Sequence, residues 1–278
     1  MAETLALLAA LSFALGTTLQ QRGTLQTDAA EGDPRFLLQI LREPVWLAGA
    51  LLQACGWVLQ AVALDRGSLV VVQALCTLSL VFALPLGVWL TAQRITHWSV
   101  VGALTALVGI VGFVSVAQTS GGTTEPSAAS WWTAAIAVVI GMAVLAGVAR
   151  RTQGGTAAAL LAAAAGLSYA FQAAVTKVFV NVIGDGLGPI LSSWTTYALI
   201  ASALAGFALQ QSALKTGFLA PAMAASNAAT LVVSVVLGVA IFDETIHRVD
   251  NGLMPALLAL ATAVTGVVIL AVAQPERS

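Results

Sequence analysis

Long apolar runs separated by short polar breaks are the dominant pattern of this chain. A helix needs about 20 consecutive apolar residues to cross the hydrocarbon core of a bilayer. Nine runs are close to that length, at 3–22, 45–64, 68–91, 98–118, 131–149, 157–179, 191–212, 217–241 and 253–273. We therefore predict an all-α integral membrane protein with about nine transmembrane helices.

Two kinds of polar break separate the predicted spans. The breaks at 65–67 and 215–217 hold a charged residue close to a glycine, which suits a tight turn at the membrane surface. Residues 23–44 are rich in charge, and we expect an exposed loop there with a short interfacial helix over 35–41. Residues 119–130 are rich in Ser, Thr and Gly and predict a linker.

Composition agrees with lipid as the solvent for most of the chain. Hydrophobic residues make up 59% of the sequence and charged residues 8%, whereas soluble domains carry about a quarter charged residues. Mean hydropathy is +0.95. The net charge of −1 gives no reason to expect a nucleic acid as partner. Membrane lipids are therefore the expected surroundings, and Cys55 and Cys76 are expected to be small core residues.

The distribution of Lys and Arg among the loops predicts the orientation. With the N-terminus outside, the loops on the inner side collect Arg22, Arg35, Arg42, Arg94, Arg150, Arg151, Lys215 and Arg277. The outer loops then hold Arg66, Lys177 and Arg248. By the positive-inside rule we predict a multi-pass protein of the cell membrane, with its N-terminus out and its C-terminus cytoplasmic. Because Glu3 stands where a signal peptide would carry a basic residue, we expect the first run to stay as a span.

The chain also repeats itself. At a shift of 150 residues, Gly56, Leu59, Gln60, Ala63, Leu64, Gly67, Leu69 and Ala74 match Gly206, Leu209, Gln210, Ala213, Leu214, Gly217, Leu219 and Ala224. At a shift of 156 residues, 11–14 matches 167–170, and the ends 103–104 and 116–118 match 259–260 and 272–274. The matching polar and glycine positions keep the same order along the chain, which favours a true duplication.

This repeat predicts a 4+1+4 layout. The first four-helix repeat covers 1–118, followed by an extracytoplasmic linker at 119–130 and a connector helix at 131–149. The second repeat covers 157–274. Five spans separate each element from its copy, and an odd number inverts the copy in the membrane. Inverted repeats are the physical basis of alternating access, with a site near the midplane between the halves.

The residues that carry the repeat resemble a known group. The stretches LALLAALSFALGTTLQQRG (5–23), GWVLQAVALDRGSLVVVQAL (56–75) and TAQRITHWSVVGALTALVGIVGFV (91–114) resemble the four-helix unit of small multidrug resistance proteins. The whole chain resembles the fused form of that unit, the EamA-like repeat of the drug/metabolite transporter (DMT) superfamily. Its nine-span layout is similar to the magnesium-transporter-like NIPA branch. The resemblance implies a transporter with a small-molecule substrate, and it leaves a homodimer open.

One departure from that family changes the expected chemistry. The resemblance implies a glutamate in the first helix that binds a proton and a cationic drug alternately. This chain carries Phe13 at that position and Tyr169 in the second half. Proton-for-cation exchange is therefore not implied for it.

Amide side chains dominate the polar groups inside the predicted spans. Such groups are costly in a membrane and tend to line a substrate path or to join helices. Gln53, Trp57 and Gln60 are spaced to share one helix face. Amides suit a neutral or zwitterionic solute, or a lipid headgroup, better than a divalent cation. The candidate cavity-lining residues are Phe13, Gln20, Gln53, Trp57, Gln60, Gln73, Tyr169, Gln172, Gln210 and Asn227. The alternative for each amide is a bridge between two helices, and for each aromatic residue ordinary packing.

Several further residues carry structural expectations. Pro85 and Pro221 lie within predicted spans, where a proline removes a backbone hydrogen bond and kinks the helix. Trp131 and Trp132 are expected in an interfacial belt. Lys177 ends a span and is expected to extend toward the membrane surface, or to meet an anionic headgroup.

Acidic residues are expected only at span ends. Asp65, Asp243 and Glu244 all lie at such ends. His97 and His247 match at a shift of 150 and are expected in solvated loops.

The sequence contains no phosphate-binding glycine loop, nucleophile–base pair or metal-ligand spacing. We therefore expect a protein that is not an enzyme and needs no cofactor or bound metal. The first hypothesis is a secondary transporter or exporter of a small polar or amphipathic solute. The alternatives are a flippase for a lipid-linked headgroup, a magnesium or other cation transporter, and a membrane scaffold without transport activity.

Overall fold

A computed structural model describes residues 1–25, 42–91, 96–116, 118–120, 123, 126–184, 186–214, 216, 219–247 and 254–272. Its helices are α1 (Ala2–Leu25), α3 (Pro44–Arg66), α4 (Leu69–Cys76), α5 (Ser79–Thr91), α6 (His97–Val116), α7 (Ala128–Ala149), α8 (Gly154–Ile183), α9 (Leu187–Ser192), α10 (Trp194–Leu214), α11 (Leu219–Phe242) and α12 (Met254–Val272). Two three-residue strands, β1 (Gln118–Ser120) and β2 (Thr245–His247), complete the described elements.

Helices cover all nine predicted apolar runs to within a few residues at their ends. By length and hydropathy, six segments of the described chain are able to cross a membrane: Ala2–Gln20, Pro44–Arg66, Leu69–Leu90, Ala128–Ala149, Gly154–Ile183 and Ala225–Phe242. Two shorter apolar segments lie at Val100–Ser115 and Met254–Ile269. The chain is thus an α-helical membrane protein. The interfacial helix expected over 35–41 falls outside the described residues.

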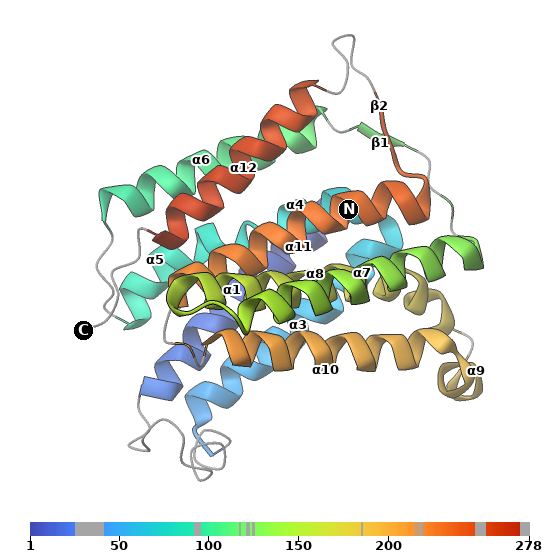
Figure 1. Ribbon diagram of the computed structural model, residues 1–278, viewed down its shortest axis with the longest axis horizontal. Helices are drawn as coiled ribbons and strands as arrows, with labels where there is room; N and C mark the ends of the chain where they lie inside the picture. The colour runs from blue at the N-terminus through green and yellow to red at the C-terminus, as the bar shows by residue number, and fades with distance from the viewer. Residues whose placement is uncertain are drawn as a thin grey trace.

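The helices pack as two groups, and two further helices, α6 and α12, pack against each other. In the first group α1 packs along α3 and also contacts α4 and α5. In the second group α8 packs along α10 and α11 and also contacts α7. Helices α6 and α12 run side by side and mainly contact each other (Figure 1). α1 and α8 are therefore the central helices of their respective groups.

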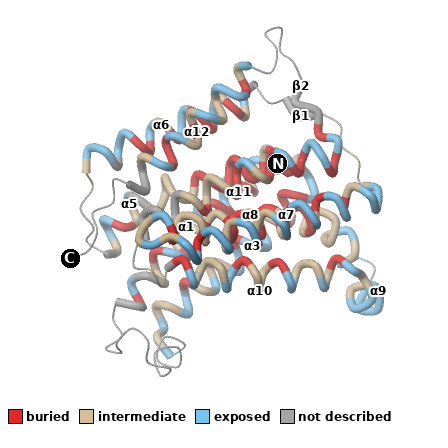
Figure 2. Tube along the Cα trace, viewed as in Figure 1, coloured by how far each residue is buried: buried red, intermediate tan, exposed pale blue. Residues whose placement is uncertain are grey.

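Large apolar side chains cover much of the outer surface, as expected of a protein in lipid. Helix α7 carries no charged residue and exposes Trp132, Ile136, Val139 and Ile140. The exposed positions recur along the outward sides of α6 and α7 (Figure 2). In water such a surface would be unfavourable, because monomeric soluble proteins rarely expose apolar patches of this extent.

The crossing of α6 and α12 is reciprocal. A Cβ atom placed on Gly109 would lie 2.2 Å from the amide nitrogen of Ala263, and one placed on Gly266 would lie 2.1 Å from the amide nitrogen of Ala106. Each glycine thus faces the alanine that precedes the other glycine by three residues. This self-complementary pattern is that of a two-fold contact. The positions that this pattern relates, Gly109 to Gly266 and Ala106 to Ala263, are 157 residues apart, one more than the shift of 156 that matches 103–104 with 259–260.

The predicted span at 68–91 is divided at a different place from the expected proline kink. The helix ends at Cys76 and restarts at Ser79, whereas α5 continues through Pro85. At the break, the amide of Leu78 donates to the carbonyl of Leu75, and the amide of Leu80 donates to that of Thr77. These hydrogen bonds, from each amide to the carbonyl three residues earlier, are of the 3₁₀ type. They tighten the turn and interrupt the α-helical pattern.

The expectation of a kink at Pro221 depends on where that proline lies in its helix. Pro221 is the third residue of α11, in the first turn. There the missing N–H costs no intrahelical hydrogen bond, so a proline is tolerated without a bend.

The predicted linker at 119–130 contains regular structure at both ends. Gln118–Ser120 pairs antiparallel with Thr245–His247, with Thr119 opposite Ile246. At its other end the connector helix begins at Ala128, three residues before the predicted start at 131. The Ser127 side chain accepts a hydrogen bond from the Ser130 amide and caps that helix. The amide of Thr123 also donates to the carbonyl of Phe242, so the linker is joined to the end of α11.

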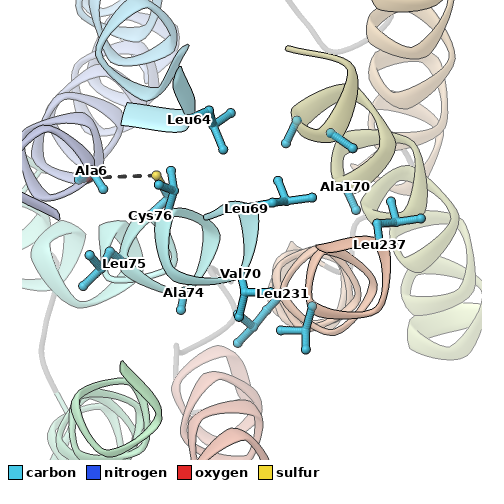
Figure 3. Packing of buried hydrophobic residues seen from close by; sticks show 14 of the residues in the cluster. Ala6, Leu64, Leu69, Val70, Ala74, Leu75, Cys76, Ala170, Leu231 and Leu237 are labelled. Atoms are coloured by element: carbon cyan, nitrogen blue, oxygen red, sulfur yellow. Dashed lines mark hydrogen bonds between the residues drawn. The ribbon is translucent and has the colours of Figure 1, made fainter. Parts of the chain in front are cut away.

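Helix α4 lies at the centre of the core. Seven of its eight residues are buried. Figure 3 shows Leu69 and Val70 close to Leu231 and Leu237 of α11, with Ala170 of α8 nearby. On its other side, Cys76 lies 3.9 Å from the Ala6 carbonyl of α1. This short helix of the first group is therefore packed directly against the second group.

Candidate functional site

Two of the predicted amides bind each other. Gln60 of α3 donates its Nε2 to Oε1 of Gln73 on α4, at 3.2 Å. Gln73 is buried and Gln60 is half-buried. These side chains thus join two helices of the first half, which is the bridging arrangement considered as the alternative to cavity lining.

Gln20 and Gln53 lie at the close contact of α1 with α3. A Cβ on Gly16 would lie 2.9 Å from Oε1 of Gln53, and a Cβ on Gly49 would lie 2.7 Å from the amide nitrogen of Gln20. The two glycines therefore let the helices approach closely beside the amides. Gln53 Oε1 is buried and has no hydrogen-bond partner within the described residues. Such an acceptor is a natural position for a water molecule or a solute donor.

The two aromatic candidates make equivalent contacts in the two halves. Phe13 of α1 lies over Gly56 of α3, where an added Cβ would be 2.5 Å from the ring. Tyr169 of α8 lies over Gly206 of α10, where an added Cβ would be 2.6 Å from the ring. Both pairs are repeat mates in the sequence alignment. The same aromatic-on-glycine contact therefore occurs at both places.

Trp57 departs from the expectation that it shares a covered face with Gln53 and Gln60. Its side chain is 57% exposed. The face of α3 turned inward is centred on Gly49, Gly56 and Ala63, which are buried. Trp57 lies to one side of that stripe, since adjacent helix positions are about 100° apart. Its repeat mate Phe207 is 58% exposed as well, so both rings are largely on the lipid-facing surface. The remaining candidates Gln172, Gln210 and Asn227 are half-buried.

The most distinctive polar site involves Lys177 and Glu244, for which the sequence predicted no contact. Glu244 follows α11 and is 0% exposed, although the sequence placed it at a span end. Its Oε1 lies 2.5 Å from the Nζ of Lys177 on α8. Lys177, expected to extend toward the membrane surface, is instead directed to this carboxylate and is 17% exposed. A charged pair in such a place is costly unless it is fully hydrogen-bonded.

Backbone groups complete the coordination of Glu244. Its Oε1 accepts from the amide of Leu69 at 2.6 Å, and its Oε2 accepts from the amide of Val70 at 3.1 Å. These amides belong to the first turn of α4, whose N–H groups have no partner within the helix. The positive end of the helix dipole favours an anion at this position. The carboxylate is therefore satisfied by one ammonium and one helix N-terminus.

The local chain path turns Glu244 inward. Asp243 adopts a positive φ of 51°, a conformation that Asp tolerates better than most residues. After this reversal the amide of Glu244 donates to the carbonyl of Gly238. Gly238 leaves space for the side chain, because a Cβ there would lie 2.7 Å from Oε2 of Glu244. The positive φ of Asp243 and the absence of a side chain at Gly238 thus allow Glu244 to point into the core.

Aromatic rings line one side of the pair. The Nζ of Lys177 lies 4.6 Å from the centroid of Phe242, a cation–π distance. Trp131 packs edge-on against Phe242, Phe171 and Trp194 at centroid distances of 5.9, 6.0 and 5.0 Å. Trp131 is buried against these rings, whereas its neighbour Trp132 is 70% exposed. The first tryptophan turns toward α8 and the second outward.

A cavity of about 50 Å³ lies beside the ion pair. Its lining residues are Leu64, Asp65, Thr123, Lys177, Val178, Asn181 and Phe242. None of the ten predicted cavity-lining residues is among them. In the sequence, Lys177 and Glu244 lie at span ends that the predicted orientation puts on the same side of the membrane. This shared side was the one sequence feature that could have suggested their contact. Within the described ranges, no group of three His, Cys, Asp or Glu side chains gathers as a metal site.

Comparison with known proteins gives a relative without a described activity. The chain is 29% identical over 253 residues to an uncharacterized protein of Corynebacterium glutamicum, and the match covers 88% of this chain and 86% of that protein. No family model matches the chain. No solved structure matches it. The similarity extends through both predicted halves.

Proposed function

We propose that this protein is a secondary transporter of the drug/metabolite type, which moves a small polar or amphipathic solute by alternating access. The observation that carries this proposal is the reciprocal contact of Gly109 with Ala263 and of Gly266 with Ala106. A two-fold contact between the last helices of two four-helix groups is what an inverted repeat produces. The recurrence of the aromatic-on-glycine contact supports the same arrangement.

Polar groups at the helix contacts support a hydrophilic path. Oε1 of Gln53, which has no hydrogen-bond partner among the described residues, is on a helix that runs through the bundle. In lipid such a buried acceptor has no alternative partner, so it favours a water molecule or a solute donor beside α1 and α3. A headgroup flippase of the same fold would need a basic side chain open at headgroup depth. Lys177 does not supply that side chain, because it is directed to Glu244.

The orientation belongs to the proposal. The ends of α3, α8 and α11 meet at one end of the bundle, because Leu64, Lys177 and Phe242 line one cavity. Under the positive-inside rule that end is external. The helices α1 and α7 run the other way. The exposed residues at or near their ends, Arg22, Arg150 and Arg151, are then on the cytoplasmic side. We therefore propose nine spans with the N-terminus outside.

The transport test can be run on an unidentified substrate. Proteoliposomes are incubated with a soluble metabolite extract, and their contents are compared with those of protein-free liposomes by mass spectrometry. A transporter is expected to accumulate particular solutes, and preloading with the same solute is expected to accelerate exchange. Entry of labelled lipid headgroups or of Mg²⁺ alone would favour the alternatives. No solute above the protein-free level would contradict the proposal.

Gln60→Leu and Gln210→Leu are expected to reduce that exchange by roughly tenfold each, the factor for loss of one hydrogen bond to a polar solute. The first change also removes the donor to Gln73. Initial uptake rates, normalised to folded protein, check the expectation. Ser212→Ala is the matched control, because Ser212 is exposed and bonds within its own helix to the Ala208 carbonyl. Undiminished uptake by folded Leu variants would show that these amides only bridge helices.

A further inference from the structure

The contact of Glu244 joins the two halves of the molecule at one end. Glu244 and Lys177 belong to the second repeat, whereas Leu69 and Val70 begin a helix of the first repeat. The carboxylate is fully buried between them. Separation of the halves at this end would therefore have to remove Glu244 from the first turn of α4.

We infer that this contact is a latch, which keeps the end of the bundle next to β1 and β2 closed and biases the protein toward the state that is open at the opposite end. The inference rests on the proposed alternating-access function. We define the latch as Glu244, Lys177 and the amides of Leu69 and Val70. Hydrogen bonds to a charged group are stronger than neutral ones, and two backbone donors and one ammonium converge here. Breaking the contact leaves a buried charge without its partners.

The inverted repeat has no equivalent latch in its sequence. At the shift of 150, which also aligns His97 with His247, the residue that corresponds to Glu244 is Arg94. At the shift of 156, the residue that corresponds to Lys177 is Gln21. A cation is unfavourable at a helix N-terminus, where an anion is favoured. The same contact therefore cannot form at the opposite end when the two halves exchange conformations.

This asymmetry separates the energies of two states that a perfect repeat would make equal. In an inverted repeat, each state is obtained from the other by exchanging the conformations of the halves. The latch adds stabilisation to only one of them. The resting population is therefore expected to be closed at the latch end, and a solute entering from that side must first compete with a preformed ion pair. The cavity beside Lys177 is the place where such a solute would arrive.

Distances between spin labels at both ends test the latch. In a background without Cys55 and Cys76, one pair of labels is placed at exposed Asp65 and Asn181, on α3 and α8 at the latch end. A second pair is placed at exposed Arg22 and Ser212, on α1 and α10 at the opposite end. Pulsed electron paramagnetic resonance in proteoliposomes then gives the distance distribution at each end.

Glu244→Gln is expected to raise the population with a long distance at the latch end by roughly tenfold, the change for loss of a hydrogen bond to a charged group. The distance at the opposite end is expected to shorten in parallel. Asp243→Asn is the matched control, since it changes an exposed neighbouring acid and keeps the positive φ accessible. It is expected to leave both distributions unchanged.

A second pair of variants keeps the test decisive if Glu244→Gln folds poorly. Glu244→Asp retains the charge but shortens the side chain, so a smaller shift in the same direction is expected. The charge-swapped variant Lys177→Glu with Glu244→Lys keeps an ion pair but directs a cation to α4, and is expected to remain open at the latch end.

The outcomes distinguish the latch from the proposed function. Unchanged distances in folded Glu244→Gln and Glu244→Asp would overturn the latch even if transport is intact. Restoration of the closed distance by the charge swap would also overturn it, because a simple ion pair would then suffice. Opening at the latch end without closure at the other end would support the latch and contradict alternating access.

Discussion

Glu244→Ala is expected to lower the free energy of unfolding by about 3–5 kcal/mol, the cost of removing one partner from a buried charge pair. Without the carboxylate, Lys177 and the amides of Leu69 and Val70 lose their shared acceptor. Each buried group would then bear its own desolvation cost. Unfolding in mixed micelles of mild detergent and sodium dodecyl sulfate, followed by circular dichroism, measures the change.

The double variant Lys177→Met with Glu244→Leu separates the charge from the packing. Replacement of a buried pair by apolar side chains of similar size is often neutral or stabilising. The double variant is therefore expected to recover most of the loss, although the two amides of α4 stay without a carboxylate. A double variant that is as unstable as the sum of the single variants would show that the side chains act independently. Asp243→Asn serves again as the neighbouring control.

Gly109→Ala and Gly266→Ala are each expected to destabilise the protein by about 1–3 kcal/mol, because the added methyl group meets backbone rather than a flexible side chain. The new Cβ would lie 2.2 Å and 2.1 Å, respectively, from an amide nitrogen of the opposite helix. Helices α6 and α12 must then move apart. The same unfolding assay in mixed micelles measures the loss.

Gly147→Ala is the matched control for this pair. Gly147 is also in a helix, and an added Cβ there would have no neighbour within 4 Å. It is expected to be neutral or to gain about 0.5–1 kcal/mol from the lower flexibility of the unfolded chain. The double variant Gly109→Ala with Gly266→Ala is expected to cost less than the sum, since a single separation of the helices accommodates both methyl groups. Strict additivity would argue against a shared crossing.

The helical layout followed from the sequence because hydropathy in a membrane protein is a strong and local signal. Every predicted run corresponds to a helix or a helix pair. The break at Thr77 was not predicted, since the run from 68 to 91 contains no charged residue and Pro85 was the more obvious candidate. A turn formed by 3₁₀-type hydrogen bonds between backbone groups does not change the hydropathy of the sequence. The equivalence of Phe13 with Tyr169 was predictable, because each faces a glycine that is present in both halves of this chain.

The candidate site was harder to predict than the layout. Lys177 and Glu244 are 67 residues apart, and each lies at a span end where a charge needs no special explanation. Only the positive φ of Asp243 and the space at Gly238 turn the acid inward, and neither can be read from periodicity. The spacing of residues along the helix predicted that Trp57 shares a face with Gln53 and Gln60. That spacing does not show which face of α3 packs against its neighbours. The partner helix decides that.

In the proposed alternating-access cycle, the crossing of Gly109 and Gly266 would also determine how the two halves move. A reciprocal contact on a two-fold axis is converted into itself when the halves exchange their conformations. In that proposed cycle, contacts away from the axis, such as that of Glu244 with α4, would be broken and remade each time. In the proposed alternating-access cycle, the α6–α12 crossing would therefore stay the same in both states, and the other helices would rotate about it. Its glycines set the backbone separation at that point, so an added methyl group there would shift the pivot of the whole movement.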